Sequence, residues 1–80
     1  MVLREAIASR ILEICSDNGI TVNKLSTISG ITQSTLNNII NTGSKNPTVS
    51  TVKKVCDGVN MTLAEFFDSS LFENLEQEVR

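Results

Sequence analysis

Hydrophobic residues recur at three- and four-residue steps along most of this 80-residue chain, which is the spacing of one face of an α-helix. A helix at about residues 4–17 is predicted by one apolar stripe, formed by Leu3, Ile7, Ile11, Ile14 and Cys15, with charged residues such as Arg10 expected on the solvent side. Similar stripes predict helices at about residues 22–29, 33–41, 49–59 and 63–68. One proline and four glycines leave few turn signals for a sheet. The pattern therefore predicts an all-α fold.

Three helix starts share one local design. A hydrophobic residue immediately precedes a threonine, and a second hydrophobic residue lies five positions after the first. The threonine hydroxyl can accept a hydrogen bond from a free amide of the first turn, and the two hydrophobic residues can pack as a staple. The three starts are Ile20-Thr21 with Leu25, Ile31-Thr32 with Leu36, and Met61-Thr62 with Phe66. Glu65 would complete a capping box with Thr62, and Thr48 is expected to cap the fourth helix. Leu25 and Ile28 are expected to be buried in the second helix, and Val49 and Val52 in the fourth.

Size and composition restrict the classes of protein that fit. Eighty residues make one domain, and the core must be aliphatic because the chain has three Phe and no Trp or Tyr. No apolar run approaches the roughly 18 residues of a membrane span, and the first residues do not resemble a secretory signal. Cys15 and Cys56 fall in apolar stripes and are expected to be reduced core residues, so the location is expected to be cytoplasmic. With no His and no recognisable pair of catalytic groups, neither an enzyme nor a metal or other cofactor is expected.

The charges are unevenly distributed along the chain. Between Asn18 and Cys56 there are four lysines and no acidic residue, although the whole chain has a net charge of −2. The lysines are Lys24, Lys45, Lys53 and Lys54. Such a window predicts a cationic face, and a cationic face fits a polyanionic partner.

The third predicted helix presents an unusual polar face. With Leu36, Ile39 and Ile40 facing the core, the outward positions hold amides and one hydroxyl, namely Gln33, Ser34, Asn37, Asn38 and Asn41. Asn and Gln present a donor and an acceptor together, which matches the paired groups of adenine in the major groove. The lysines lie off this face and are expected to contact phosphates instead. An ordinary solvated helix face is the alternative interpretation of the same residues.

Three segments together resemble the phage repressor and Cro-type (XRE-like) helix-turn-helix family. The first motif helix is Val22-Asn23-Lys24-Leu25-Ser26, the turn is Ser29-Gly30-Ile31-Thr32, and the recognition helix is Gln33-Ser34-Thr35-Leu36-Asn37-Asn38-Ile39. Residues 41–48 and 61–67 are similar to the loop and the closing helix of the family. The resemblance implies a compact five-helix lambda-repressor-like DNA-binding domain, and the tail is compatible with a short sixth C-terminal helix. Val22 differs from the family, which often has a phosphate-clamping Gln at this place.

The resemblance also implies a function and a set of site residues. The expected function is a sequence-specific transcriptional regulator, bacterial or phage-encoded, that binds double-stranded DNA as a homodimer with the third helix in the major groove. The expected base-contacting residues are Gln33, Ser34, Asn37 and Asn38. The expected DNA-backbone contacts are Lys24, Thr32, Asn41, Lys45 and Asn46.

The C-terminal part of the chain suggests a second role. Residues 1–68 are expected to form the helix-turn-helix domain and residues 69–80 an acidic amphipathic tail. Phe67, Leu71, Phe72 and Leu75 are the candidate dimer residues. The alternative function is a protein-interaction module of the same fold, such as an antitoxin-like or adaptor subunit, which would use this apolar cluster to bind a different chain.

Overall fold

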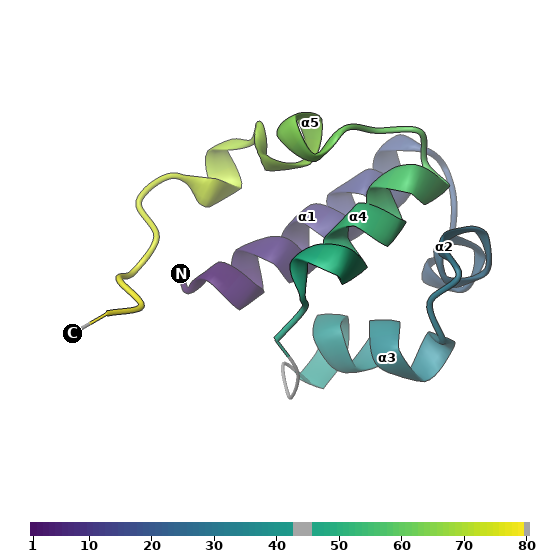
Figure 1. Ribbon diagram of the computed structural model, residues 1–80, viewed down its shortest axis with the longest axis horizontal. Coiled ribbons are helices and arrows are strands. Elements are labelled where there is room, and N and C mark those ends of the chain that lie inside the picture. Colours follow the sequence, from purple (N-terminus) through teal and green to yellow (C-terminus); the bar gives the residue numbers. More distant parts are fainter. Residues whose placement is uncertain (43–45, 80) are drawn as a thin grey trace.

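A computed structural model describes residues 1–42 and 46–79, and these segments form an all-helical domain (Figure 1). The helices are α1 (Leu3–Asp17), α2 (Val22–Ser29), α3 (Gln33–Asn37), α4 (Val49–Gly58) and α5 (Leu63–Phe67). A π turn, Asn38–Thr42, continues α3, and a 3-10 turn, Ser70–Phe72, follows α5. The predicted all-α, five-helix fold is confirmed.

The predicted threonine caps are present at each of the four helix starts. The Oγ1 atoms of Thr21, Thr32, Thr48 and Thr62 accept hydrogen bonds from the amide three residues later, at 3.0–3.2 Å. The Thr62 amide in turn donates to the Glu65 carboxylate at 2.8 Å, which completes the capping box. Hydrogen bonds from Thr62 hold the pKa of Glu65 below its ordinary value. Local side-chain chemistry therefore sets where these helices begin.

The core lies between α1, α4 and the helices around them (Figure 1). Its fully buried side chains are Ile11, Ile14, Leu25, Leu36, Val55, Cys56 and Phe66. Cys15 and Cys56 are buried free thiols, and burial raises the pKa of both. In Figure 1, α3 lies on one side of the α1 and α4 pair and α5 lies on the opposite side. A surface that uses α3 is therefore separate from a surface that uses α5.

Arg10 was expected on the solvent side of α1, and that prediction is wrong. The side chain is 8% exposed, and its Nε atom donates to the Phe66 carbonyl at 2.7 Å. A second guanidinium nitrogen donates to the Glu65 carbonyl at 2.9 Å, and the third pairs with Glu13. Arg10 therefore satisfies the Phe66 carbonyl at the end of α5 and gives the Glu65 carbonyl a second donor beside the Asp68 amide, which lies at 3.3 Å.

Three residues of the predicted apolar stripes are exposed instead. Leu3 is 36% exposed at the first position of α1. Ile28 is 38% exposed because α2 turns the small side chains of Ser26 and Ser29 inward. This rotation follows from a close crossing with α4, where a Cβ on Gly58 would lie 2.4 Å from Ser29 Oγ. Val49 is 72% exposed because the buried stripe of α4 begins only at Val52.

The tail differs from the sixth helix that its amphipathic pattern suggested. Within residues 69–79 the structure has only the three-residue 3-10 turn, whose Ser69 cap accepts from the Leu71 amide at 3.2 Å. Phe72 packs against the core, and the Glu76 amide donates to the Met1 carbonyl at 3.2 Å. These contacts attach the tail as far as Glu76 to the core and to the residue Met1 that precedes α1.

Candidate nucleic-acid interface

The connection between α2 and α3 has the geometry of a helix-turn-helix. Gly30 ends α2 in the left-handed conformation, with φ of 67°, which is favourable for glycine because it has no Cβ. The Ile31 amide donates to the Ser26 carbonyl at 3.2 Å, and Ser26 Oγ donates to the Ile31 carbonyl at 2.7 Å. These two bonds close the turn, and the Thr32 cap starts α3 immediately after it.

A side-chain bond between the first turns of α2 and α3 orients one candidate base contact. The Gln33 Nε2 atom donates to Asn23 Oδ1. Gln33 keeps a second N–H and its carbonyl oxygen, which together are the donor and acceptor pair needed for an adenine edge. The sequence prediction did not include Asn23. The sequence contains an indication of this contact, because Asn23 and Gln33 both follow a threonine cap in two helices joined by a short turn.

The four predicted base-contacting residues lie on one helix. Gln33 and Ser34 are exposed at its start, and Asn37 and Asn38 are half-buried at the junction with the π turn. Neither acidic residues nor exposed large hydrophobic residues occur in α3. We call Gln33, Ser34, Asn37 and Asn38 the recognition face. Its side chains are chemically suited to base edges, although their contact with bases remains a prediction.

The predicted backbone-contacting residues lie around the recognition face. Lys24 is exposed in the first turn of α2, and Asn46 is exposed just before α4. The Thr32 hydroxyl is already used locally, because it accepts from the Thr35 amide and donates to Thr35 Oγ1 at 2.8 Å. Lys45 lies outside the described residues.

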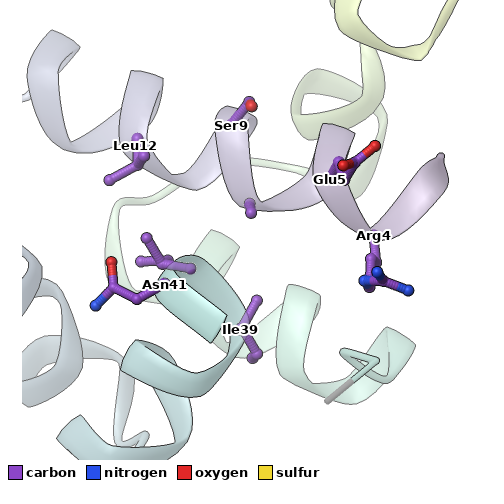
Figure 2. Close-up of a pocket in the computed structure, with 8 residues that line it drawn as sticks. Arg4, Glu5, Ser9, Leu12, Ile39 and Asn41 are labelled. Carbon is purple, nitrogen blue, oxygen red and sulfur yellow. The ribbon is translucent and has the colours of Figure 1, made fainter. Parts of the chain in front are cut away.

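Asn41, also predicted as a backbone contact, is exposed in the π turn beside α1 (Figure 2). A π turn is wider than an α-helical turn, so residues beyond it are rotated relative to a continuous α-helix. Asn41 lines a cavity of about 300 Å³ together with residues of α1, including Arg4 and Leu12. Residues of α1 therefore lie beside the end of the predicted recognition helix, and the sequence prediction did not include them.

Ion pairs remove some cations from the set that could bind DNA. Lys53 pairs with Asp57 one turn later on α4, and Arg10 pairs with Glu13. Within residues 1–42 and 46–79, Arg4, Lys24 and Lys54 have no acidic partner. The predicted cationic window therefore contributes fewer available charges than its lysine count suggests.

The candidate dimer residues form an apolar cluster on the other side of the domain from α3 (Figure 1). The Phe67 ring is 5.0 Å from Phe66 and 4.9 Å from Phe72, centroid to centroid, in edge-to-face arrangements. Phe67 is 40% exposed, whereas Leu71, Phe72 and Leu75 are half-buried. Phe72 therefore contributes to the domain's own packing, and Phe67 is the member most available to another chain.

The turn, the capped recognition helix and the acid-free window define a helix-turn-helix DNA-binding domain. Residues 10–70 match the family model of the Cro/C1-type HTH DNA-binding domain. The chain belongs to this family and is a DNA-binding regulator in general terms. No curated protein and no solved structure matches it significantly.

Two kinds of feature are absent from the part of the chain that the structure describes. None of the helices in residues 1–42 and 46–79 is long and apolar enough to cross a membrane. In the same residues, His, Cys, Asp and Glu do not gather in groups of three or more that could hold a metal ion.

Proposed function

We propose that this protein is a sequence-specific transcriptional regulator that binds double-stranded DNA as a homodimer. The observation that supports the proposal most is the recognition face, because it presents only amides and a hydroxyl on a helix whose start is fixed by Thr32 and the Gly30 turn. A helix of this kind fits the major groove of B-DNA, which is about 12 Å wide. The family match supports DNA as the partner.

In this proposal the side chains have different tasks. Gln33 and Asn37 contact base edges through paired donor and acceptor groups, and Ser34 and Asn38 contribute further contacts beside them. Lys24, Asn41, Lys45 and Asn46 contact phosphates and fix the position of the helix in the groove. At Thr32 we assign the phosphate contact to the amides of the first turn of α3, since its hydroxyl is occupied.

Selection of bound sequences from random DNA, followed by fluorescence anisotropy, tests the proposal. We expect one enriched site with two-fold symmetry and half-sites about one helical turn apart. Gln33→Ala and Asn37→Ala should each lower discrimination at one base position by about 1–3 kcal/mol. Gln77→Ala is the matched control, because Gln77 is an exposed amide in the tail. Absence of any preferred site at about 50 mM salt, with all three variants equal to wild type, would exclude this function.

We propose that the apolar cluster around Phe67 forms the dimer contact. Phe67→Ser should shift the protein toward monomer in analytical ultracentrifugation while leaving its helical circular dichroism unchanged. Weaker binding to the two-fold site should accompany this shift, because a monomer contacts only one half-site. A wild-type protein that is monomeric at all concentrations, and that captures a different chain through Phe67, would support the alternative of an antitoxin-like or adaptor module.

The remaining assignments belong to the same proposal. Residues 1–68 form the DNA-binding domain, and residues 69–80 form the acidic tail that contributes Leu71, Phe72 and Leu75 to the dimer. A regulator of this kind works in the cytoplasm of a bacterium, encoded by the host or by a phage.

A further inference from the structure

The end of the recognition helix lies against the first half of α1 rather than at an open edge. The cavity of about 300 Å³ between them is lined by Arg4, Ala8 and Leu12 of α1 and by Ile40 and Asn41 of the π turn (Figure 2). A second cavity, of about 260 Å³, is lined by Arg4 and Glu78 together with Asn46 and Pro47, and within the described residues no ion pair joins Arg4 to Glu78. Arg4 therefore shares a cavity with residues on each side of the connection between α3 and α4, where Asn41 and Asn46 are proposed to contact phosphates.

The charge of Arg4 is available at this place. Arg4 is exposed and has no acidic partner in the part of the chain that the structure describes. The neighbouring Glu5, which also lines the first cavity, accepts a hydrogen bond from the Val2 amide at 3.0 Å, and Figure 2 shows the Glu5 and Arg4 side chains extending in different directions from α1. The helix dipole disfavours a cation in the first turn of a helix, so the stability of α1 does not explain Arg4.

The positions of Arg4 and Lys24 relative to α3 indicate which part of a bound DNA each side chain would face. The bond between Asn23 and Gln33 places the first turn of α2, with Lys24, beside the start of the recognition helix. Arg4 lies beside its other end. The helical segment between these two ends runs from residue 33 to residue 42, which is roughly 15 Å at 1.5 Å per residue. This length matches a major groove about 12 Å wide, whose two walls are the two phosphate backbones.

We infer that Arg4 contacts a DNA phosphate on the wall of the major groove opposite to the wall contacted by Lys24. The inference rests on the proposed function, because it requires α3 to lie in the groove. The Arg4 guanidinium offers hydrogen-bond donors to the phosphate, while Asn41 lies toward the Leu12 end of the same cavity (Figure 2). Arg4 lies outside the lysine window, so the charge pattern of the sequence alone does not indicate it.

The test is the salt dependence of DNA binding by the full chain. For wild type, Arg4→Gln and Arg4→Lys, the association constant for a selected DNA site and for an unrelated DNA is measured between about 50 and 200 mM salt. The matched control is Lys53→Gln, which removes the same charge from a lysine that is already paired with Asp57. Circular dichroism checks that each variant is folded.

We expect the slope of log K against log [salt] for Arg4→Gln to fall in magnitude by about 0.9, the value for one phosphate contact. The change should be the same for both DNAs, because a phosphate contact contains no sequence information. Arg4→Lys should restore most of the slope, and Lys53→Gln should change it by less than half as much as Arg4→Gln.

Two outcomes would overturn the inference, and they differ in meaning. If wild type binds its selected site and Arg4→Gln has the wild-type slope, or only the change seen for Lys53→Gln, Arg4 does not contact DNA although the proposed function stands. If wild type binds neither DNA at low salt, the proposed function and the inference fail together.

Discussion

Replacing Arg10 by methionine tests what attaches α5 to the rest of the domain. The guanidinium donates to the carbonyls of Phe66 and Glu65, and its carbon lies 5.9 Å from the centre of the Phe66 ring. Methionine has a similar unbranched stem, so it should keep most of the packing while removing both donors. The substitution therefore isolates the polar contribution of Arg10.

The expected cost follows from the two lost hydrogen bonds. A hydrogen bond from a charged group contributes about 1.5–3 kcal/mol, but the cost of burying the guanidinium charge is recovered when it is removed. We expect a net loss of about 2–3 kcal/mol. An 80-residue domain has a total stability of about 4–12 kcal/mol. The loss is thus a large fraction of the total and should lower the midpoint of thermal unfolding by roughly 10–20 °C.

Urea unfolding followed by circular dichroism measures this loss. Arg4→Met is the matched control, because Arg4 is an exposed arginine on the same helix, and its cost should stay within about 0.5 kcal/mol. Glu13→Gln should also cost little, since the Glu13 side chain is 44% exposed. A cost for Arg10→Met below about 1 kcal/mol, or equal to that of Arg4→Met, would refute the view that Arg10 holds α5 in place.

Four further predictions concern stability and reactivity. Gly58→Ala should destabilise the domain by roughly 1 kcal/mol despite the better helix preference of alanine, because its Cβ would lie 3.2 Å from the Ser29 Cα and much closer to Ser29 Oγ. Ser29→Ala should be neutral or stabilising in urea unfolding, since Ser29 Oγ is buried without a partner. The same substitution should reduce the cost of Gly58→Ala. If the two variants have additive effects on stability, the close crossing of α2 and α4 is contradicted. Because the pKa of Glu65 is lowered in the folded protein, its carboxylate should stabilise the fold. This stabilisation is present above the unfolded-state pKa of about 4.3 and is lost as the pH falls through the lower folded-state value. The difference in free energy of unfolding between wild type and Glu65→Gln should therefore become smaller in acid. A difference that is independent of pH would contradict this prediction. Cys15 and Cys56 should react with a thiol reagent only on unfolding, because both are buried and burial raises their pKa; rapid labelling of the native protein would show that one of them is accessible.

The helix boundaries were predictable because their causes are local. A threonine cap involves an amide three residues away, so the sequence near Thr21, Thr32 and Thr62 contains all the participants. The predicted range of α2, residues 22–29, agrees with the structure for this reason. Gly19 and Asn60, with positive φ values of 62° and 58°, follow α1 and α4, where a residue in the left-handed conformation commonly ends a helix.

Burial of individual side chains was less predictable because it depends on residues far away in the chain. Arg10 contacts a carbonyl 56 residues later, and no pattern within α1 indicates that partner. Ile28 is exposed because Gly58 lets α4 approach the serines of α2. A periodic stripe shows which side of a helix is apolar, but the contact with a neighbouring helix decides how far that side is rotated.

For the site, the recognition face was predictable and its surroundings were not. Gln33 to Asn37 form one short helix and Asn38 begins the π turn that continues it, so their common face follows from helical geometry alone. The approach of Arg4 to the end of α3 depends on the packing of α1 against the π turn, which the sequence does not reveal. The ion pair of Lys53 with Asp57 also follows from their four-residue spacing on a helix. It reduces the positive charge that the acid-free window between Asn18 and Cys56 would otherwise present to DNA.

The close crossing of α2 and α4 couples the stability of the domain to the placement of the recognition face. α3 is fixed to α2 through the Gly30 turn, through the bond from Ser26 to Ile31, and through the bond from Gln33 to Asn23. A displacement of α2 is therefore transmitted to α3. A Cβ at Gly58 would push α2 away from α4 and tilt the recognition helix, although Gly58 itself is remote in sequence from α3. DNA affinity should consequently fall for Gly58→Ala even under conditions in which the protein stays folded, and Ser29→Ala should recover part of both losses.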